Sequence, residues 1–272
     1  MGLLKLCCFG DLHYIGDKAW LNNYFLPKVS ENCAGCDAAV IVGDVSGTGR
    51  LEHVRELLLG VKRVFQGPII VVPGNHDIYV LQDEQDRGLN SLIKLSMFNS
   101  LVRDLGCVAL MLEPYVLNDV GFVGSIGWYD YTYAPDYLGL KIEDFRKKEY
   151  GFSVWMDKFF AKFPFSDEEF TFILVNRLEE DIRKIYDKVN VIVAVFHHVP
   201  FRKMVKYKLK PGWDYFSTFM GSEAFGYLLT RFKDKVKLAL HGHAHEGSRR
   251  CVKIKGIKVC NCANPIPITV EV

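Results

Sequence analysis

The sequence lacks a long hydrophobic run, a strong net charge and a low-complexity segment, and each absence excludes a class of protein. The apolar run at 3–9 is far shorter than the roughly 20 residues of a transmembrane helix. A formal net charge of +2 provides no overall field that would attract nucleic acid or an anionic membrane. No linker or repeat divides the chain, so we expect one domain over residues 1–272, in the cytoplasm and away from membranes.

The eight cysteines do not complete a recognisable zinc or disulfide pattern. Cys33 and Cys36 have the spacing of half a zinc site or of a redox pair, but no second Cys-x-x-Cys completes a tetrahedral site. Cys251 with the Cys260–Cys262 pair offers only a weak partner. A chain of this length needs no covalent staples, so we expect reduced, partly buried thiols.

Alternating elements predict an α/β fold. Strands at 3–9, 38–42 and 69–72 enclose helices at about 18–32 and 51–65, an order that favours parallel strands with right-handed crossovers. Further predicted elements are a helix at about 85–104, short strands near 107–112, 115–118 and 120–124 with a hairpin turn at Asn118-Asp119, a helix at 166–188 that begins with a capping box, a strand at 190–196, a helix at about 221–231, and strands at 236–240, 249–254 and 257–261.

Five short motifs contain most of the side chains that bind hard metal ions. They are Asp11-Leu12-His13, Gly43-Asp44, Gly74-Asn75-His76-Asp77, His197-His198 and Gly242-His243-Ala244-His245. All eight histidines except His53 lie in a motif or, like His241, directly beside one. The first three motifs each follow a predicted strand, and ligands of open α/β sheets bind beyond the carboxyl ends of the strands. The sequence therefore predicts one site.

The charges of these side chains suit a pair of metal ions that binds phosphate. Two divalent ions bring a charge of about +4, and Asp11 and Asp44 bring −2, so a positive surplus remains even with a bridging hydroxide. Asp44 is alone in its motif and is the natural bridge between two ions about 3.5–4 Å apart.

The ordered set D-x-H, G-D, G-N-H-[DE], H and G-H-x-H resembles the calcineurin-like metallophosphoesterases over Asp11–His245. The resemblance implies a four-layer α/β/β/α sandwich with two mixed β-sheets flanked by helices. It assigns Asp11, His13, Asp44 and His245 to one ion, and Asp44, Asn75, His197 and His243 to the other. A metal-bridging hydroxide would then attack phosphorus in line.

The same resemblance implies that His76 is not a metal ligand. It would face the substrate instead and either protonate the leaving alkoxide or stabilise the transition state. Asp77 would then orient His76 as a partner behind it. Each assignment has a plainer alternative: Asp11, Asp44 and Asn75 are common turn residues, and His198 and His241 more often pack behind ligands than act in catalysis.

Departures from individual family branches narrow the function. Gly47 stands where the purple acid phosphatases place a tyrosine ligand, and Gly43–Gly47 lacks the G-D-x-x-D-R-G of the protein serine/threonine phosphatases. Those phosphatases also read G-N-H-E, where this chain has Asp77, and lipid A pathway hydrolases usually have Arg at the position of His76. Mixed oxygen and imidazole ligands predict two divalent ions, Mn, Fe or Zn, with Co and Ni as alternatives.

Two further segments bear on the substrate. The aromatic stretch 127–133, at the start of an insertion of about 127–165, predicts either a cap that stacks on a flat group or a satellite core. The basic stretch 202–210 predicts either a solvated loop or a contact with remote phosphates or a nucleic-acid backbone. We expect a phosphodiesterase or phosphatase acting on small or nucleotide-like esters; the alternatives are a nuclease and a non-catalytic binding module.

Overall fold

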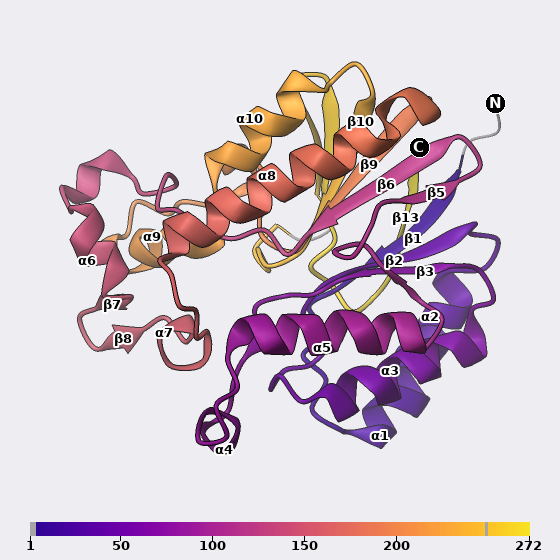
Figure 1. Cartoon of the computed structure of the whole chain (residues 1–272), viewed down its shortest axis with the longest axis horizontal. Helices are drawn as coiled ribbons and strands as arrows, with labels where there is room; N and C mark the ends of the chain where they lie inside the picture. The colour runs from indigo at the N-terminus through magenta and orange to yellow at the C-terminus, as the bar shows by residue number, and fades with distance from the viewer. Residues whose placement is uncertain (1–3, 248–249) are drawn as a thin grey trace.

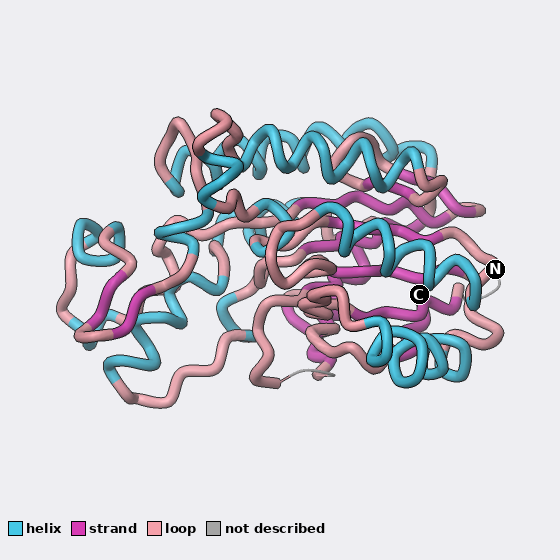
Figure 2. The backbone as a smooth tube through the Cα atoms, turned by 90° about the horizontal axis from the view of Figure 1, so that it is seen from below, coloured by secondary structure: helices cyan, strands magenta, loops and turns pink. Residues whose placement is uncertain are grey.

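Two β-sheets lie face to face in the computed structural model, which describes residues 4–247 and 250–272. Helices cover the outer face of each sheet, and Figure 2 shows these helical layers on either side of the strands. The arrangement confirms the predicted four-layer α/β/β/α sandwich with two mixed sheets (Figure 1).

The first sheet has five strands in the order β13-β1-β2-β3-β4. Strands β1 to β4 are parallel, and the C-terminal strand β13 pairs antiparallel with β1. The strands are β1 (Lys5–Phe9), β2 (Ala38–Val42), β3 (Ile69–Val72), β4 (Val108–Ala109) and β13 (Ile268–Glu271). Its outer face packs against α1 (Lys18–Trp20), η1 (Leu21–Phe25), α2 (Leu26–Asn32), α3 (Leu51–Val64) and α5 (Ser91–Asp104).

The second sheet has six strands in the order β11-β12-β10-β9-β6-β5. The four central strands are parallel, and the two edge strands are antiparallel to their neighbours. The strands are β5 (Tyr115–Leu117), β6 (Val120–Ser125), β9 (Val191–Phe196), β10 (Val236–His241), β11 (Cys251–Ile254) and β12 (Ile257–Asn261). Helices α8 (Asp167–Ile185) and α10 (Glu223–Arg231) cover its outer face.

Alternation along the strands separates the core into layers. Phe9 and Ile41 pack toward the helices, whereas Cys8 and Val40 face the second sheet in the layer between the sheets. Successive side chains of a strand point to opposite faces, and here both faces are buried. The inner strands are therefore continuous apolar runs such as the Ala38–Val42 strand, whose five residues are all buried.

The parallel strands of both sheets end at the same edge of the sandwich. Strands β1, β2 and β3 lead into the first three motifs, and β9 and β10 lead into the last two. The two sheets are joined there by the His197 ring, whose Nδ1 donates to the Val42 carbonyl oxygen of β2 at 2.9 Å. Within the second sheet, the Gly242 N–H after β10 donates to the His197 carbonyl oxygen after β9 at 3.0 Å. All five motifs consequently reach one place.

Several predicted boundaries are wrong. The helix expected at 85–104 is split into α4 (Gln82–Gln85) and α5, because the Asn90 side chain caps α5 by accepting from the N–H groups of Leu92 and Ile93. The strand expected at 107–112 shortens to Val108–Ala109. Residue 3 of the first predicted strand and residue 249 of the strand at 249–254 lie outside the described residues.

Short elements that the sequence did not reveal connect the main helices and strands. The insertion contains the β7–β8 hairpin, and its neighbouring elements stand at one end of the molecule (Figure 1). The elements are η2 (His76–Ile78), η3 (Asp136–Leu138), α6 (Ile142–Arg146), β7 (Glu149–Tyr150), β8 (Ser153–Val154), α7 (Asp157–Phe160), η4 (Tyr186–Lys188), η5 (Arg202–Met204), α9 (Pro211–Ser217) and η6 (Thr218–Met220).

The aromatic stretch 127–133 builds core and does not stack on a ligand. Trp128, Tyr129, Tyr131 and Tyr133 are all buried in the cluster beneath α8. The Trp128 and Tyr131 polar groups are satisfied there by the carboxylate of Asp167. Of the two alternatives predicted for this stretch, the satellite core is the one observed.

The expectation of reduced cysteines is wrong for four of the eight. Cys7 is bonded to Cys33, and Cys251 is bonded to Cys260 across the β11–β12 pair. A chain of this length can fold without disulfide bonds, but it can still form them. Which cysteines pair depends on which of them the fold brings together. Cys8, Cys36, Cys107 and Cys262 are free thiols.

Within the described residues, no helix has the length and apolar character that crossing a bilayer requires.

Alkylation of the denatured, unreduced protein should label four cysteines, and prior reduction should raise the number to eight. The 26-residue separation of Cys7 and Cys33 corresponds to about 3.5 kcal/mol of chain-entropy stabilisation. Reduction should therefore also lower the urea midpoint, whereas Cys107→Ser, at a buried free thiol, should not change the count of protected cysteines. Mass spectrometry that finds eight labelled cysteines without reductant would contradict the pairing.

Candidate metal centre

The site is built on backbone conformations that residues other than glycine rarely adopt. Nine described non-glycine residues have positive φ, and four of them are predicted ligands: Asp11 (52°), His13 (44°), Asp44 (49°) and His243 (64°). Each such conformation costs about 1–3 kcal/mol and is typical of functional sites. Two turns brace each other here, because Asp11 N–H donates to the Gly43 carbonyl at 3.0 Å and His13 N–H donates to the Asp44 carbonyl at 2.9 Å.

One group of donor atoms combines Asp11, His13 and His245, which lie within 4.8 Å of one another. Asp11 Oδ1 is 3.0 Å from His245 Nε2, and the Nε2 atoms of His13 and His245 are 3.3 Å apart. The Asp11 carboxylate also accepts the His243 backbone N–H at 3.0 Å. A Cβ on Gly242 would stand 2.4 Å from Asp11 Oδ2, so this position requires glycine.

A second group combines His197, Asn75 and His243. Because His197 Nδ1 donates to a carbonyl, the neutral ring has no proton on Nε2. That nitrogen lies 3.0 Å from the Asn75 carboxamide oxygen and 3.1 Å from His243 Nδ1. The Asn75 oxygen and His197 Nε2 are both acceptors, so they face each other without a proton between them. Such a pair fits a cation bound by both.

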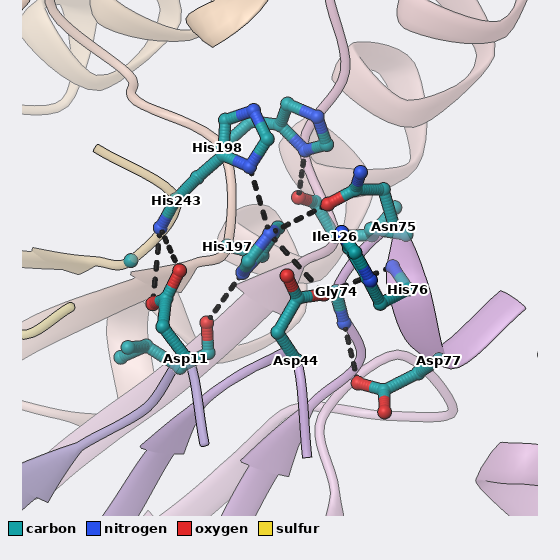
Figure 3. Close-up of polar contacts among 12 residues, drawn as sticks. Asp11, Asp44, Gly74, Asn75, His76, Asp77, Ile126, His197, His198 and His243 are labelled. Carbon is teal, nitrogen blue, oxygen red and sulfur yellow. Dashed lines mark hydrogen bonds and ion pairs between the residues drawn. The ribbon is translucent and has the colours of Figure 1, made fainter. Parts of the chain in front are cut away.

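Asp44 lies between the two groups, and Figure 3 shows its side chain directed toward the His197 ring. Its Oδ2 is 3.6 Å from His13 Nε2, and its Oδ1 is 3.5 Å from His197 Nε2. Oδ1 also accepts the His76 backbone N–H at 2.9 Å. A Cβ on Gly74 would stand 2.1 Å from the same oxygen, which explains the glycine before Asn75. Each carboxylate oxygen of Asp44 therefore faces one donor group.

The electrostatics of the site also fit bound cations. Burial, together with the nearby carboxylate of Asp11, raises the pKa of Asp44 well above its ordinary range. Burial lowers the pKa of His197 well below its ordinary value, and burial with the neighbouring rings of His76 and His245 lowers that of His13 to about 3. Neutral imidazoles are the form that binds metals, and a buried carboxylate needs positive charge beside it. Two divalent ions would supply that charge.

The structure brings all seven predicted ligands together from five separate motifs. His76 lies at the same place, within 4.8 Å of donor atoms of His13 and Asp44. Its Nδ1 is 3.1 Å from the Gly47 carbonyl oxygen, and its ring packs against that of Tyr79 at 4.5 Å. Because a carbonyl only accepts, Nδ1 carries the proton, which leaves Nε2 free to face the site. The assignment of each side chain to one ion stays a prediction.

The expected contact between Asp77 and the His76 ring is wrong. The buried Asp77 carboxylate accepts the backbone N–H groups of Ser46, Gly74 and Val45 at 2.7, 2.8 and 3.2 Å. It points away from the ligands toward these loops (Figure 3). Burial raises the pKa of Asp77 to about 7, although the backbone donors oppose the shift. Adjacency in sequence misled the prediction, since η2 turns the two side chains in different directions.

The remaining histidines lie behind or away from the ligands. His198 packs its ring 4.2 Å from that of His243, and its Nδ1 is 3.1 Å from the Ile126 carbonyl oxygen. His241 is buried with Nδ1 on the Gly242 carbonyl at 2.9 Å. His53 lies on α3, next to the ring of Tyr14 and apart from the motifs.

A profile of the calcineurin-like phosphoesterase family matches residues 4–247. The chain belongs to this family. Its members hydrolyse phosphoric esters with the help of metal ions, and this chain is a metal-dependent phosphoric ester hydrolase. A search of curated protein sequences finds no significant match.

Solved structures show the same fold at low sequence identity. The phosphopantetheinyl hydrolase of Mycobacterium tuberculosis has a TM-score of 0.77 and 18% identity, and the alignment covers 98% of this chain and 96% of that one. A protein of Staphylococcus aureus assigned as a 5′-nucleotidase has a TM-score of 0.54 and 12% identity, with 99% of this chain and 51% of that one covered. These likenesses establish the fold of the phosphoesterase.

Asp157 is a residue of the site that sequence reasoning missed. It begins α7 in the insertion, is fully buried, and accepts hydrogen bonds from Asn75 Nδ2, Tyr79 Oη, Tyr129 Oη and Trp155 Nε1 at 2.7–2.8 Å. Burial raises the pKa of Asp157, but the charge of Lys148 and the hydrogen bonds of Asn75 and Tyr79 outweigh it, so the pKa is lowered overall. No local pattern marks this aspartate, because its partners come from distant segments.

A cavity of about 710 Å³ opens on the ligands of the phosphoesterase. Its inner end includes His13, Asp44, Asn75 and His76, and its walls come from the insertion and from residues 205–220. A volume of this size is typical of sites that enclose a small organic molecule.

The basic stretch 202–210 is largely paired within the chain. Lys206 and Lys208 each lie 2.9 Å from the carboxylate of Glu246, and Arg202 donates to the Ala134 carbonyl at 3.1 Å. Lys208 also stands 3.2 Å above the ring of Trp213. These lysines fasten the loop to the edge of the site, so the sequence-based alternative of a free phosphate-binding stretch loses its main support.

Asp77→Ala should lower the free energy of unfolding of the metal-free protein by at least about 3 kcal/mol, because it leaves three buried N–H groups without an acceptor. His76→Ala removes one contact to a carbonyl and should cost less than about 1.5 kcal/mol. Urea unfolding measures both. Equal stability of Asp77→Ala and the unmodified protein would contradict the loop-holding role.

Proposed function

We propose that this chain is a dinuclear phosphoesterase that hydrolyses phosphodiester or phosphomonoester bonds of small or nucleotide-like substrates. The observation that carries the proposal is the position of Asp44, whose two oxygens face two separate donor groups at 3.5 and 3.6 Å. A carboxylate between two ligand sets is what a two-metal site needs as its bridge.

Two divalent ions bound there would polarise the phosphoryl oxygens and provide an ionised water at neutral pH. The chain itself supplies the geometry. The strained turns at Asp11 and Asp44 fix both carboxylates before any ligand arrives, so little reorganisation remains for the reaction. His76 lines the cavity with Nε2 free, and the Gly47 carbonyl and the Tyr79 ring limit its rotation. We assign it the protonation of the leaving oxygen, for which Nε2 must first take up a proton from solvent, because the Nδ1 proton is held by the Gly47 carbonyl and burial lowers the pKa of the ring.

The donor set supports the same choice of metals as the sequence. Imidazole nitrogens, carboxylate oxygens and one carboxamide oxygen suit Mn, Fe or Zn, with Co and Ni as alternatives. The proposal also keeps the chain as one domain over residues 1–272, since β13 from the C-terminal end pairs with β1 and both sheets contribute ligands. A cytoplasmic location remains a proposal; disulfides are typical of oxidising compartments but also occur inside hyperthermophiles.

The two alternative functions have less support. A nuclease would need free cations along a strand, whereas Lys206 and Lys208 are paired with Glu246. A non-catalytic binding module would be expected to have lost ligands, and all seven predicted ligands are present and convergent.

Asp44→Asn should lose metal and activity together, because it removes the charge that both ions share. Metal content by elemental analysis should fall from two ions per chain, and turnover of bis(p-nitrophenyl) phosphate with Mn should fall by at least about 1000-fold. His76→Gln is the matched comparison: it should keep both ions while turnover falls about 100- to 10,000-fold. No turnover by the unmodified protein with Mn, Fe, Co, Ni or Zn would refute the proposal.

A further inference from the structure

The walls of the cavity differ from its inner end. Toward the ligands it is polar, but outward it is lined by aromatic and aliphatic side chains. Among these are Trp155, Met156, Val205, Trp213, Phe216 and Met220. Met156 and Trp213 are 47% and 40% exposed, so both present accessible apolar surface to the cavity that they line. They belong to β8–α7 and α9, at the end of the molecule where the insertion stands (Figure 1).

This apolar wall begins at a predicted metal ligand and continues outward. The Trp155 ring lies edge-on to that of His243 at 5.8 Å and stacks beside Phe216 at 6.2 Å. Farther out, Trp213 is held by its Nε1–H on the Lys206 carbonyl at 2.9 Å and by Lys208 against its ring. A substrate with phosphorus beside His243 would therefore have its remaining atoms along fixed apolar surfaces.

Charged groups for a second phosphate are scarce. Among the described residues that line the cavity, Lys206 is the one lysine and there is no arginine, and Lys206 is paired with Glu246. Recognition of an additional phosphate normally uses free lysine or arginine side chains. The wall therefore favours a substrate with a single phosphoryl group.

We propose that the substrate is a phosphoester with one phosphoryl group and an extended, uncharged apolar arm, which packs along Trp155, Phe216 and Trp213. This inference rests on the proposed phosphoesterase function and names its substrate class. It argues against nucleoside polyphosphates and oligonucleotides as substrates.

The first experiment measures binding of the apolar arm separately from hydrolysis of the ester. Binding of methylphosphonate and octylphosphonate to the Mn-loaded protein should be compared by calorimetry, and hydrolysis of the methyl, butyl and octyl p-nitrophenyl phosphodiesters should be followed in parallel. Each buried methylene should raise affinity and kcat/KM by up to about fourfold, so octylphosphonate should bind at least about tenfold more tightly. The p-nitrophenyl ester of thymidine 5′-phosphate should lose kcat/KM when a second phosphate is added.

Trp213→Ala should lower the preference for the octyl arm about tenfold. This preference is the affinity for octylphosphonate divided by the affinity for methylphosphonate, both measured on the same variant. Phe152→Ala is the matched control, because Phe152 is fully exposed at the tip of the β7–β8 hairpin and does not line the cavity. Equal binding of the two phosphonates would overturn the substrate class, while turnover of the methyl ester would leave the phosphoesterase function intact. Tight octylphosphonate binding without turnover of any ester would support the apolar site and refute the proposed function.

A separate observation concerns the orientation of Asn75. Its Nδ2 donates to Asp157 at 2.8 Å and to Tyr79 Oη at 3.1 Å, so its carboxamide oxygen is turned toward His197. In the opposite orientation, the NH₂ group would face His197 and a carbonyl oxygen would face the buried Asp157 carboxylate. Only the observed orientation offers oxygen to a cation.

We infer that Asp157 is a positioning residue that fixes Asn75 as a metal ligand from within the insertion. Asp157→Asn can keep the fold but can no longer force the carboxamide to turn its oxygen inward. It should weaken one of two Co²⁺ sites about 10- to 100-fold and leave the other unchanged, because Asn75 belongs to one donor group only. Titration with Co²⁺, followed by visible absorption and elemental analysis, gives this result without any assay of activity.

Asp214→Asn is the matched control. Asp214 is equally buried and accepts from Tyr137 Oη and the Lys208 N–H at 2.6 and 2.8 Å, with no contact to the ligands. It should lose stability and keep both Co²⁺ sites. If Asp157→Asn does not fold, Tyr79→Phe removes one donor to Asp157 and one acceptor for Asn75, and should weaken the same site more mildly. Unchanged affinity at both sites, or equal loss at both, would overturn the inference.

Discussion

The structure depends on one buried carboxylate that has no positive charge of its own beside it. Asp44 is 1% exposed, its neighbours are neutral imidazoles and the carboxylate of Asp11, and burial raises its pKa. In its ionised form such a group needs cations or several hydrogen-bond donors beside it, because desolvating an unpaired charge costs several kcal/mol, and Asp44 accepts a backbone N–H from His76 while its other neighbours supply no positive charge. The strained turns and the glycines around Asp44 hold this carboxylate in place.

The fold meets this constraint by placing the ends of two sheets opposite each other. Parallel strands release their loops at one edge, so β1, β2 and β3 supply carboxylates and an amide from one side. Strands β9 and β10 supply imidazoles from the other side. The His197 ring joins them, with one nitrogen on the first sheet and the other toward the ligands. Because the ligands directly follow strands of two tightly packed sheets, their positions are fixed by the packing of the sheets.

The insertion adds specificity to a site that the sheets alone would leave open. One short segment, 153–157, supplies Trp155 to the apolar wall and Asp157 to the orientation of Asn75. The same indole donates to the same aspartate at 2.8 Å, so the wall and the metal ligand share a support. Substitutions in this segment are therefore expected to affect substrate range and metal affinity together, although the segment carries no recognisable motif.

The sequence by itself determined the parallel strands of the first half and the convergence of the first three motifs, because element order and strand ends are local features with one topological outcome. The four layers and the full set of seven ligands were implied by the resemblance of the ordered motifs to a known family. Tertiary structure alone decided the rest. Asp77 holds loops and not His76, Cys7 finds Cys33, and Asp157 reaches Asn75 across 82 residues. Such contacts join segments whose proximity arises only when the chain packs, and no periodicity or spacing encodes them.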